Sequence, residues 1–282
     1  MSVMFNSARK LAILAILTTS LVPSVTMGQE VGITAVVRNN VQVTTPANPT
    51  LHKAKVRERI AIGNDVVTGA VSMTQLLLLD KTSFTVGANA RVRIDRFVYD
   101  PARNASSVSA SVAKGAFRFM SGRSLKNGSE GSSIRTPVAS IGIRGTIVEG
   151  AVGEQAIDIA RREPGITQDF EADPEMASLI VLRGPGRNAQ GVQRGAIDVT
   201  VGDVTIPLED AGLALFIPGP GQAPIGPFVL SQRGIQSLRS MLGLQPIPGR
   251  DRNLARDPTT EQTFGCDGGG QDGPETCSGR SQ

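Results

Sequence analysis

The side chains that could perform catalysis are few in this sequence of 282 residues, which contains one histidine, His52. A Ser–His–acid triad would have to use that histidine, and no serine lies in the G-x-S-x-G pattern of a nucleophile elbow. The sequence also lacks an H-E-x-x-H motif, a phosphate-binding loop and a dinucleotide-binding fingerprint. We therefore expect no catalytic residue, cofactor or metal ion, and we interpret His52 as a solvated loop residue.

Acidic pairs such as Asp158 and Asp169 are the remaining candidates for acid–base chemistry. They fall in an acidic, proline-containing stretch, residues 158–175, that has little periodicity. General acid–base catalysis needs a fixed geometry, and nothing in this stretch fixes their separation. We interpret them as surface charges on an insertion or a long loop.

The two cysteines, Cys266 and Cys277, lie close together in a glycine-rich segment near the end of the sequence. In an oxidising compartment, two neighbouring cysteines most simply form a disulfide. Two thiols without a third or fourth His or Cys do not complete a structural zinc site, and the neighbouring Asp267 and Asp272 lack the EF-hand spacing. The spacing therefore predicts a Cys266–Cys277 disulfide.

Arg144 is a charged residue among apolar neighbours and glycines. An arginine in such a place suits bidentate pairing with a carboxylate or with backbone carbonyls. We expect a buried clamp that ties its strand to a hairpin, and loss of such a clamp would cost about 3–5 kcal/mol. The alternative is a site that recognises a carboxylate or phosphate. The candidate partners for the clamp are Asp80, Asp95 and Asp100.

Further arginines recur at positions where a sheet could gather them into a basic face, and an acidic surface polymer could use such a face. A solvated surface is the simpler interpretation. The arginines concerned are Arg91, Arg93, Arg96, Arg118 and Arg123.

The first residues have the composition of a targeting signal. Arg9 and Lys10 precede an apolar stretch of roughly a dozen residues that ends near Val22, too short to span a bilayer comfortably. Small residues near Gly28 suit cleavage there, and the alternative is an uncleaved anchor. We expect no transmembrane span in the mature chain, because no later apolar run approaches 18 residues.

The elements that must hold these side chains are short strands. From Val31 to about Val229, apolar residues alternate with polar ones in runs of four to eight, separated by Gly, Asn, Asp or Pro. This pattern predicts an all-β fold, either a compact sandwich or a short solenoid. The continuous run from Leu76 to Leu79 predicts a strand covered on both faces.

Short motifs follow one another within this region. Residues 62–68 and 78–82 place turn-forming residues between apolar ones, and residues 114–119 read Lys-Gly-Ala-Phe-Arg-Phe. In residues 134–146, Pro137 restricts its own φ and the conformation of Thr136, while Gly142 and Gly145 permit angles that other residues resist.

In their order, these motifs resemble the FecR-domain family, whose last signature is T-P-x-A-x-x-G-I-R-G-T. The resemblance covers residues 31–148 and implies an all-β FecR domain. Lys81 stands where the family usually has glycine, which leaves that turn type open because lysine disfavours positive φ. The resemblance implies structural roles for Asp80, Gly115, Phe117, Thr136, Pro137, Gly142, Arg144, Gly145 and Thr146.

The chain thus divides into a signal peptide at 1–28, a FecR domain at 29–150, and an insertion with additional strands completing the domain at 151–230. A short helix at 231–245 and a disordered Gly/Pro-rich tail at 246–282, which carries the disulfide loop, follow. Ser231 is the expected N-cap of that helix. Its apolar stripe favours core packing over a partner site: Ile235, Leu238, Met241 and Leu242.

The targeting signal predicts an exported protein of the periplasm or cell surface, and the missing catalytic residues predict that it is not an enzyme. In the best-known relatives, the domain sits on the periplasmic side of a membrane anti-sigma regulator and relays a signal, but the regulator part has no counterpart here. We expect an envelope binding or scaffolding module with an envelope protein or surface polymer as partner. The alternative is a periplasmic sensory accessory of a membrane receptor. Nucleic acid is excluded as a partner by export and by the 4% aromatic content, which offers few stacking residues.

The targeting signal gives a first testable prediction. Cell fractionation and N-terminal sequencing should find a mature protein that begins near Gly28 and is free of the inner membrane. A protein that keeps Arg9 and Lys10 and pellets with the inner membrane would contradict the prediction.

Overall fold

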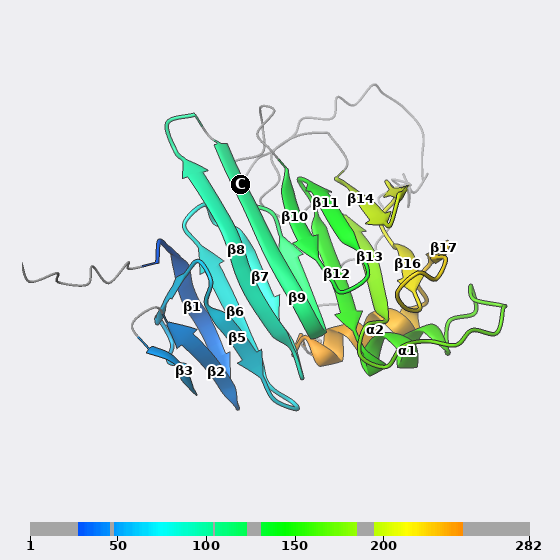
Figure 1. The fold of residues 1–282 in the computed structure, drawn as a ribbon, viewed down its shortest axis with the longest axis horizontal. Helices are drawn as coiled ribbons and strands as arrows, with labels where there is room; N and C mark the ends of the chain where they lie inside the picture. Colours follow the sequence, from blue (N-terminus) through cyan, green and yellow to red (C-terminus); the bar gives the residue numbers. More distant parts are fainter. Residues whose placement is uncertain (1–27, 46–47, 104, 123–130, 185–194, 245–282) are drawn as a thin grey trace, which may run out of the picture. The chain divides into compact units, whose positions relative to one another are not determined.

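The computed structural model describes residues 28–45, 48–103, 105–122, 131–184 and 195–244. In this part of the chain there are seventeen strands, with one helix between β12 and β13 and a second after β17, and the all-β fold is confirmed (Figure 1). Residues 1–27 of the expected signal peptide, Arg123, the tail and the expected Cys266–Cys277 disulfide lie outside the described residues. Neither helix in the described ranges is long and apolar enough to cross a membrane.

The strands form two sheets that share one long strand, β9. All strand pairs are antiparallel except β9–β10, which is parallel. Sheet A has the order β4 (Arg59–Ala61), β1 (Glu30–Arg38), β6 (Met73–Leu78), β7 (Ser83–Val86), β9 (Ala105–Met120), β12 (Ile147–Val152), β13 (Ser178–Gly184), β16 (Leu213–Ile217) and β17 (Ile225–Val229). Sheet B has the order β3 (Asn48–Lys53), β2 (Val41–Thr45), β5 (Asp65–Thr68), β8 (Arg91–Asp100), β9, β10 (Ser132–Arg135), β11 (Ser140–Arg144), β14 (Ala196–Val201) and β15 (Val204–Leu208).

The strand β9 passes from sheet B to sheet A at Gly115. Before the bend, even-numbered residues such as Val108 and Val112 are buried, whereas after it Phe117 and Phe119 are. Gly115 has a φ of 81°, and a Cβ there would lie 2.3 Å from the Cα of Ala90. Only glycine fits this place, so the bend that exchanges the buried face depends on it.

The main hydrophobic core lies between the two sheets. The phenyl ring of Phe84 on β7 is 6.4 Å from that of Phe117 and 5.8 Å from that of Phe119, centre to centre. Aliphatic side chains from both sheets complete this core, including Val92 and Ile141 from sheet B. The stacked arrangement corresponds to the sandwich alternative of the sequence prediction.

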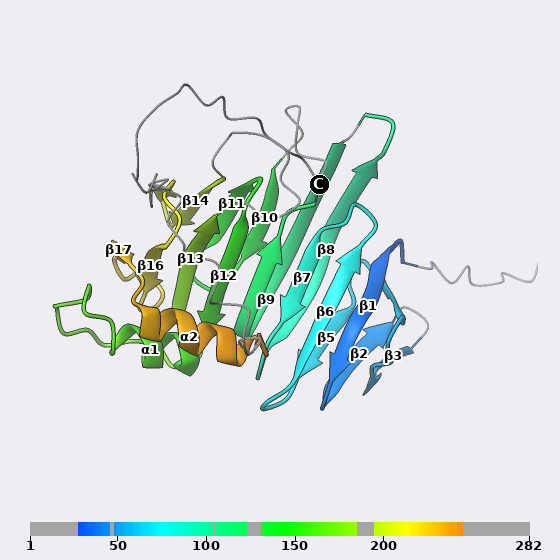
Figure 2. The same cartoon turned by 180° about the vertical axis from the view of Figure 1, so that it is seen from behind.

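The two helices cover part of the outward face of sheet A and bury a second core (Figures 1 and 2). Helix α1 (Glu154–Ala160) packs on β12 and β13, and α2 (Gln232–Met241) packs on β12. Because β13 and β16 contact a core on each face, their sequences are continuously apolar.

Helix α1 extends into the segment expected to be an insertion or a long loop. Its seven residues bury Ala156, Ile157, Ile159 and Ala160, and it is too short to show a clear helical periodicity. Helix α2 agrees with its prediction. The Ser231 side chain accepts a hydrogen bond from Gly234 N at 3.1 Å, and Leu238 and Leu242 are buried.

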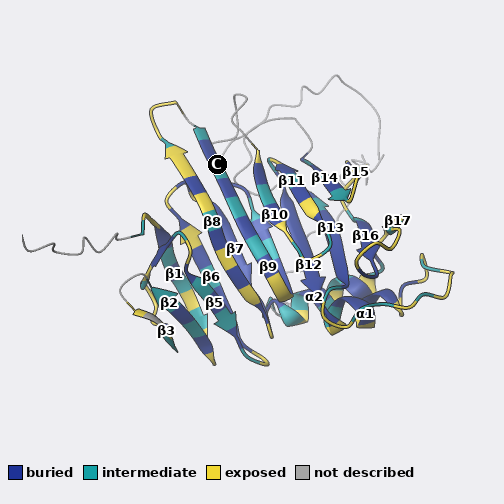
Figure 3. Ribbon diagram, viewed as in Figure 1, coloured by how far each residue is buried: buried dark blue, intermediate teal, exposed yellow. Residues whose placement is uncertain are grey.

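The expectation that residues 76–79 are covered on both faces is wrong. Leu76 and Leu78 are buried, whereas Leu77 and Leu79 are exposed. Figure 3 colours the buried and exposed segments along the strands. The helices pack on β12 and β13 and make no comparable contact with β6, so the outward side of β6 is less well covered.

The outermost strands have features that discourage pairing with another strand. Proline occurs in β3 at Pro49, in β15 at Pro207 and in β17 at Pro227, and β4 has only three residues. Proline has no N–H to donate, and within sheets it is confined to edges and bulges. Each edge of the two sheets is therefore short or interrupted.

The bend at Gly115 gives a second prediction, with Gly145 as its matched control. Both glycines have positive φ, but a Cβ on Gly145 would meet nothing within 4 Å. Gly115→Ala should lower the free energy of unfolding by about 3 kcal/mol or more, because it adds a backbone clash to the strained angle. Gly145→Ala should cost only about 1–2 kcal/mol. Equal losses in chemical denaturation would show that the contact with Ala90 is not decisive.

Candidate binding surface

The outward face of sheet B carries a regular set of polar side chains. Strand alternation places them opposite the buried residues Val66, Ile94, Ile134, Ile141 and Val199. We call this surface the Arg–Asp face. It consists of Asp65, Arg93, Asp95, Ser109, Ser111, Ser133, Arg135, Ser140, Arg144, Asp198, Thr200 and Thr205.

Arg93 on β8 and Asp65 on β5 form a two-pronged pair on this face. Arg93 Nε donates to Asp65 Oδ1 at 3.0 Å, and Nη2 donates to Oδ2 at 2.8 Å. The hydrogen bond to Asp65, with its negative charge, raises the pKa of Arg93 above its ordinary value. The guanidinium therefore stays charged and is held in a fixed orientation.

Asp95 connects three strands of the same face. Its Oδ2 accepts a hydrogen bond from Ser111 Oγ on β9 at 2.5 Å and from Arg135 Nη2 on β10 at 2.9 Å. Asp95 lies at a register shift between Ile94 and Arg96, where an extra residue enters β8. This bulge accounts for how one carboxylate reaches across β9.

Arg144 on β11 pairs with Asp198 on β14, which corrects the expected buried clamp. The distance from Arg144 Nη2 to Asp198 Oδ1 is 3.2 Å, and the side chains are 58% and 38% exposed. Strand alternation explains the outcome, because Ile143 takes the buried position and turns Arg144 to solvent. The pair still ties two strands together, but at the surface.

None of the three carboxylates expected to hold Arg144 does so. Asp80 is buried, and its carboxylate accepts hydrogen bonds from Thr82 N at 2.9 Å and Thr82 Oγ1 at 2.8 Å, and from Ser106 Oγ. Asp95 pairs with Arg135. Asp100 accepts from the backbone N–H of Ala102 at 3.0 Å. Asp80 thus fastens the β6–β7 turn to β9, and Lys81 in that turn adopts φ 70°.

The other motif residues also occupy places that hold the backbone. Thr136 and Pro137 lie in the turn between β10 and β11, where Ala139 N donates to Thr136 Oγ1 at 3.1 Å. Thr146 is buried, and its Oγ1 donates to the Gly184 carbonyl at 2.7 Å. Gly142 has ordinary room for a Cβ, and nothing in the structure explains a glycine there.

The expected basic face is divided between the two sheets. Arg91, Arg93 and Arg96 lie on β8, whereas Arg118 lies on the part of β9 that belongs to sheet A. Nothing in the sequence pattern singles out Asp65 and Asp198 as partners of the arginines of sheet B, and Asp95 is expected only as a partner of Arg144. The alternation along each strand could have found them, because the residues between the buried ones point outward. This alternation can be used only once the buried side of each strand is known.

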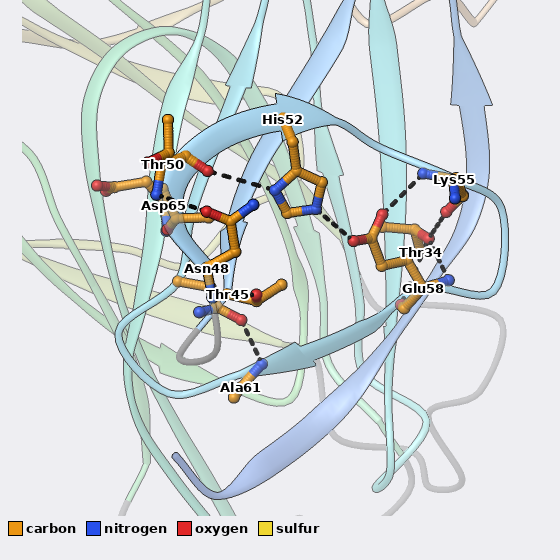
Figure 4. A network of polar contacts seen from close by, with 11 residues as sticks. Thr34, Thr45, Asn48, Thr50, His52, Lys55, Glu58, Ala61 and Asp65 are labelled. Carbon is orange, nitrogen blue, oxygen red and sulfur yellow. Dashed lines mark hydrogen bonds and ion pairs between the residues drawn. The ribbon is translucent and has the colours of Figure 1, made fainter. Parts of the chain in front are cut away.

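His52 is not a solvated loop residue, since it lies on β3 and its side chain is 30% exposed. Figure 4 shows its ring between two acceptors: Nε2 is 2.7 Å from Glu58 Oε1, and Nδ1 is 3.3 Å from the Thr50 carbonyl. Glu58 Oε2 accepts a hydrogen bond from Lys55 N at 2.8 Å. The Thr34 hydroxyl donates to the Lys55 carbonyl and accepts from Glu58 N. The hydrogen bond to Glu58 raises the pKa of His52 above 6.5. No group of three or more potential metal ligands occurs among the described side chains.

Comparison with known proteins identifies one family. The family model described as "FecR protein" matches residues 64–161, from β5 to just past α1. No curated protein matches the chain. Two crystal structures of a proposed anti-sigma factor from Parabacteroides distasonis match with TM-scores of 0.35 and 0.36 and identities of 13% and 12%. Each match covers 57% of this chain and 57% of the other, and likeness at this level carries no argument about function.

The exposure of the Arg144–Asp198 pair gives a third prediction. Arg144→Ala should change the free energy of unfolding by less than about 1 kcal/mol, because both charges remain solvated. Chemical denaturation measures this change. A loss of about 3–5 kcal/mol would instead indicate a buried clamp.

His52 gives a fourth prediction, on the pH dependence of stability. Because its folded pKa is raised, its contribution is fully present below the unfolded pKa near 6.5 and is lost as pH rises through the folded value. The loss should amount to at most about 1 kcal/mol, since the pair is partly exposed. His52→Gln should remove this part of the pH dependence in denaturation curves. An unchanged pH profile in the variant would contradict the assignment.

Proposed function

Because residues 64–161 carry a FecR domain, we propose that this protein is an exported recognition module of the bacterial envelope, without enzymatic activity, that holds its partner on the Arg–Asp face. The FecR match itself supports a regulatory or signalling role. The single observation that carries the proposal is that the matched segment supplies the central strands of this face, β8 to β11.

The side chains of the face are already ordered before any partner arrives. Arg93, Arg135 and Arg144 each have an aspartate partner on another strand, so little side-chain freedom remains to be lost on binding. Their side chains are at least half exposed, which leaves guanidinium donors available. An ordered, exposed polar surface suits specific recognition better than it suits stability.

The chemistry of the face indicates what the partner should present. Arginines, aspartates and serine hydroxyls alternate across adjacent strands, which favours a partner with both carboxylates and hydrogen-bond donors at fixed positions. A folded envelope protein meets this description, and a surface polymer with carboxylates is the other partner that we consider. Nothing in this proposal requires a cofactor.

A sensory accessory is the second candidate function. The FecR match favours it, since the same face would then transmit occupancy to a membrane receptor or regulator. The two functions differ in the identity of the captured partner, which makes them separable by experiment.

A photo-crosslinking experiment in intact cells tests the proposal. A photoreactive residue at Ser109 or Ser140 should capture a specific partner, whereas one at Leu77, exposed on sheet A, should not. Combining Arg93→Gln, Arg135→Gln and Arg144→Gln should abolish capture while the fold persists. A membrane receptor among the products supports the accessory role, and a structural envelope component supports scaffolding. Equal capture from both sheets, or capture that survives the triple substitution, would refute the assigned surface.

A further inference from the structure

Sheet A holds a buried carboxylate between two arginines on its outward side. Glu149 on β12 has no exposed side-chain surface. Arg118 Nη1 on β9 lies 2.6 Å from Glu149 Oε1, and Arg183 Nε on β13 lies 3.1 Å from Oε2. Because β12 pairs with both β9 and β13, the three side chains form a row across adjacent strands.

Stability does not account for this arrangement. Ala151 and Val181, which neighbour Glu149 on the same face, belong to the apolar core under the helices. An apolar residue at position 149 would extend that core, whereas burying ions costs desolvation that their attraction often fails to recover. Instead, the guanidiniums of Arg118 and Arg183 flank the single Glu149 carboxylate. The cluster therefore has a net positive charge although it is largely buried.

The two guanidiniums retain capacity for a second anion. Each has five N–H donors, and Glu149 has only two oxygens with which to engage them. Glu149 Oε2 lacks a hydrogen bond of good geometry, although Arg183 Nε is close to it. The arginine side chains are 27% and 23% exposed, so their outer donors are accessible from one side.

We propose that Arg118, Glu149 and Arg183 form an oxyanion site for a small ligand that carries a carboxylate or phosphate group. Glu149 fixes the orientation of both guanidiniums, and the ligand bridges their remaining donors in the planar geometry that arginine favours. This site lies on sheet A and is independent of the Arg–Asp face.

The surroundings indicate that the rest of the ligand is polar. Thr85 on β7 stands opposite Arg118, and Ser83 accepts a hydrogen bond from Gln75 Nε2 at 2.7 Å. On the other side, the helix-covered core at Ala151 and Val181 limits the space. Ser83 and Thr85 are themselves buried, whereas Gln75 is partly exposed. The ligand body therefore extends towards β7 and β6, where the Gln75 amide is the accessible polar group.

Titration of the full chain with inorganic phosphate and with succinate, at constant ionic strength, tests the site. Wild-type protein should bind at least one of the two saturably, which also identifies the preferred group. Arg183→Gln should weaken binding by roughly tenfold to a hundredfold, the equivalent of a hydrogen bond to a charged group. Arg59→Gln is the matched control, because Arg59 is an exposed arginine on β4 of sheet A that pairs with Glu30 at 3.4 Å, and this variant should bind as wild type does.

Glu149→Gln provides a second test if an arginine variant fails to fold. Removing the resident carboxylate leaves two cations that an added anion can satisfy, so the anion should raise the melting temperature of this variant more than that of wild type. Absence of saturable binding by wild type, or equal binding by wild type and folded Arg183→Gln, would overturn the proposal. An equal thermal response of Glu149→Gln and wild type would do the same.

Discussion

The passage of β9 through both sheets is the constraint on which the rest of the structure depends. One strand supplies hydrogen bonds to β8 and β10 in sheet B and to β7 and β12 in sheet A. Gly115 allows the bend, and the buried face changes at that residue from Val112 to Phe117. The core between the sheets can close only because each half of β9 turns its apolar side inward.

The same constraint distributes the polar chemistry. The first half of β9 contributes Ser109 and Ser111 to the Arg–Asp face, and the second half contributes Arg118 to the site around Glu149. Arginine serves two different purposes in these places. On sheet B each arginine of the Arg–Asp face is exposed and pairs with one aspartate. Such a pair orients the guanidinium but adds little to the free energy of unfolding. On sheet A two arginines share one buried carboxylate, and the local charge is left unbalanced.

Much of this fold could be predicted from the sequence because alternation of apolar and polar residues reports one buried face directly. Ser231 predicts the helix after the strands, which the structure contains. The motif residues Asp80 and Thr146 hydrogen-bond to backbone groups, Asp80 to Thr82 N and Thr146 to the Gly184 carbonyl. The prediction failed where burial depends on a distant element. The exposure of Leu77 and the two-sided burial of β13 follow from where the helices pack, which local sequence does not encode. The prediction of a buried Arg144 was wrong because Ile143 takes the buried position on β11, and the partner Asp198 is reached through the pairing of β11 with β14, which local sequence does not encode.

The interrupted edges of both sheets restrict how this molecule can meet its neighbours. A protein with an exposed row of backbone N–H and C=O groups invites strand addition, in which affinity comes from the main chain and discriminates poorly between sequences. Here the edge strands present no continuous row of free backbone groups, because they contain Pro207 and Pro227 or, in β4, have only three residues. Interrupted edges favour recognition by side chains over strand addition, and side-chain recognition distinguishes sequences more sharply than main-chain pairing does. Such a surface can diversify in evolution without disturbing the backbone ladder that supports it.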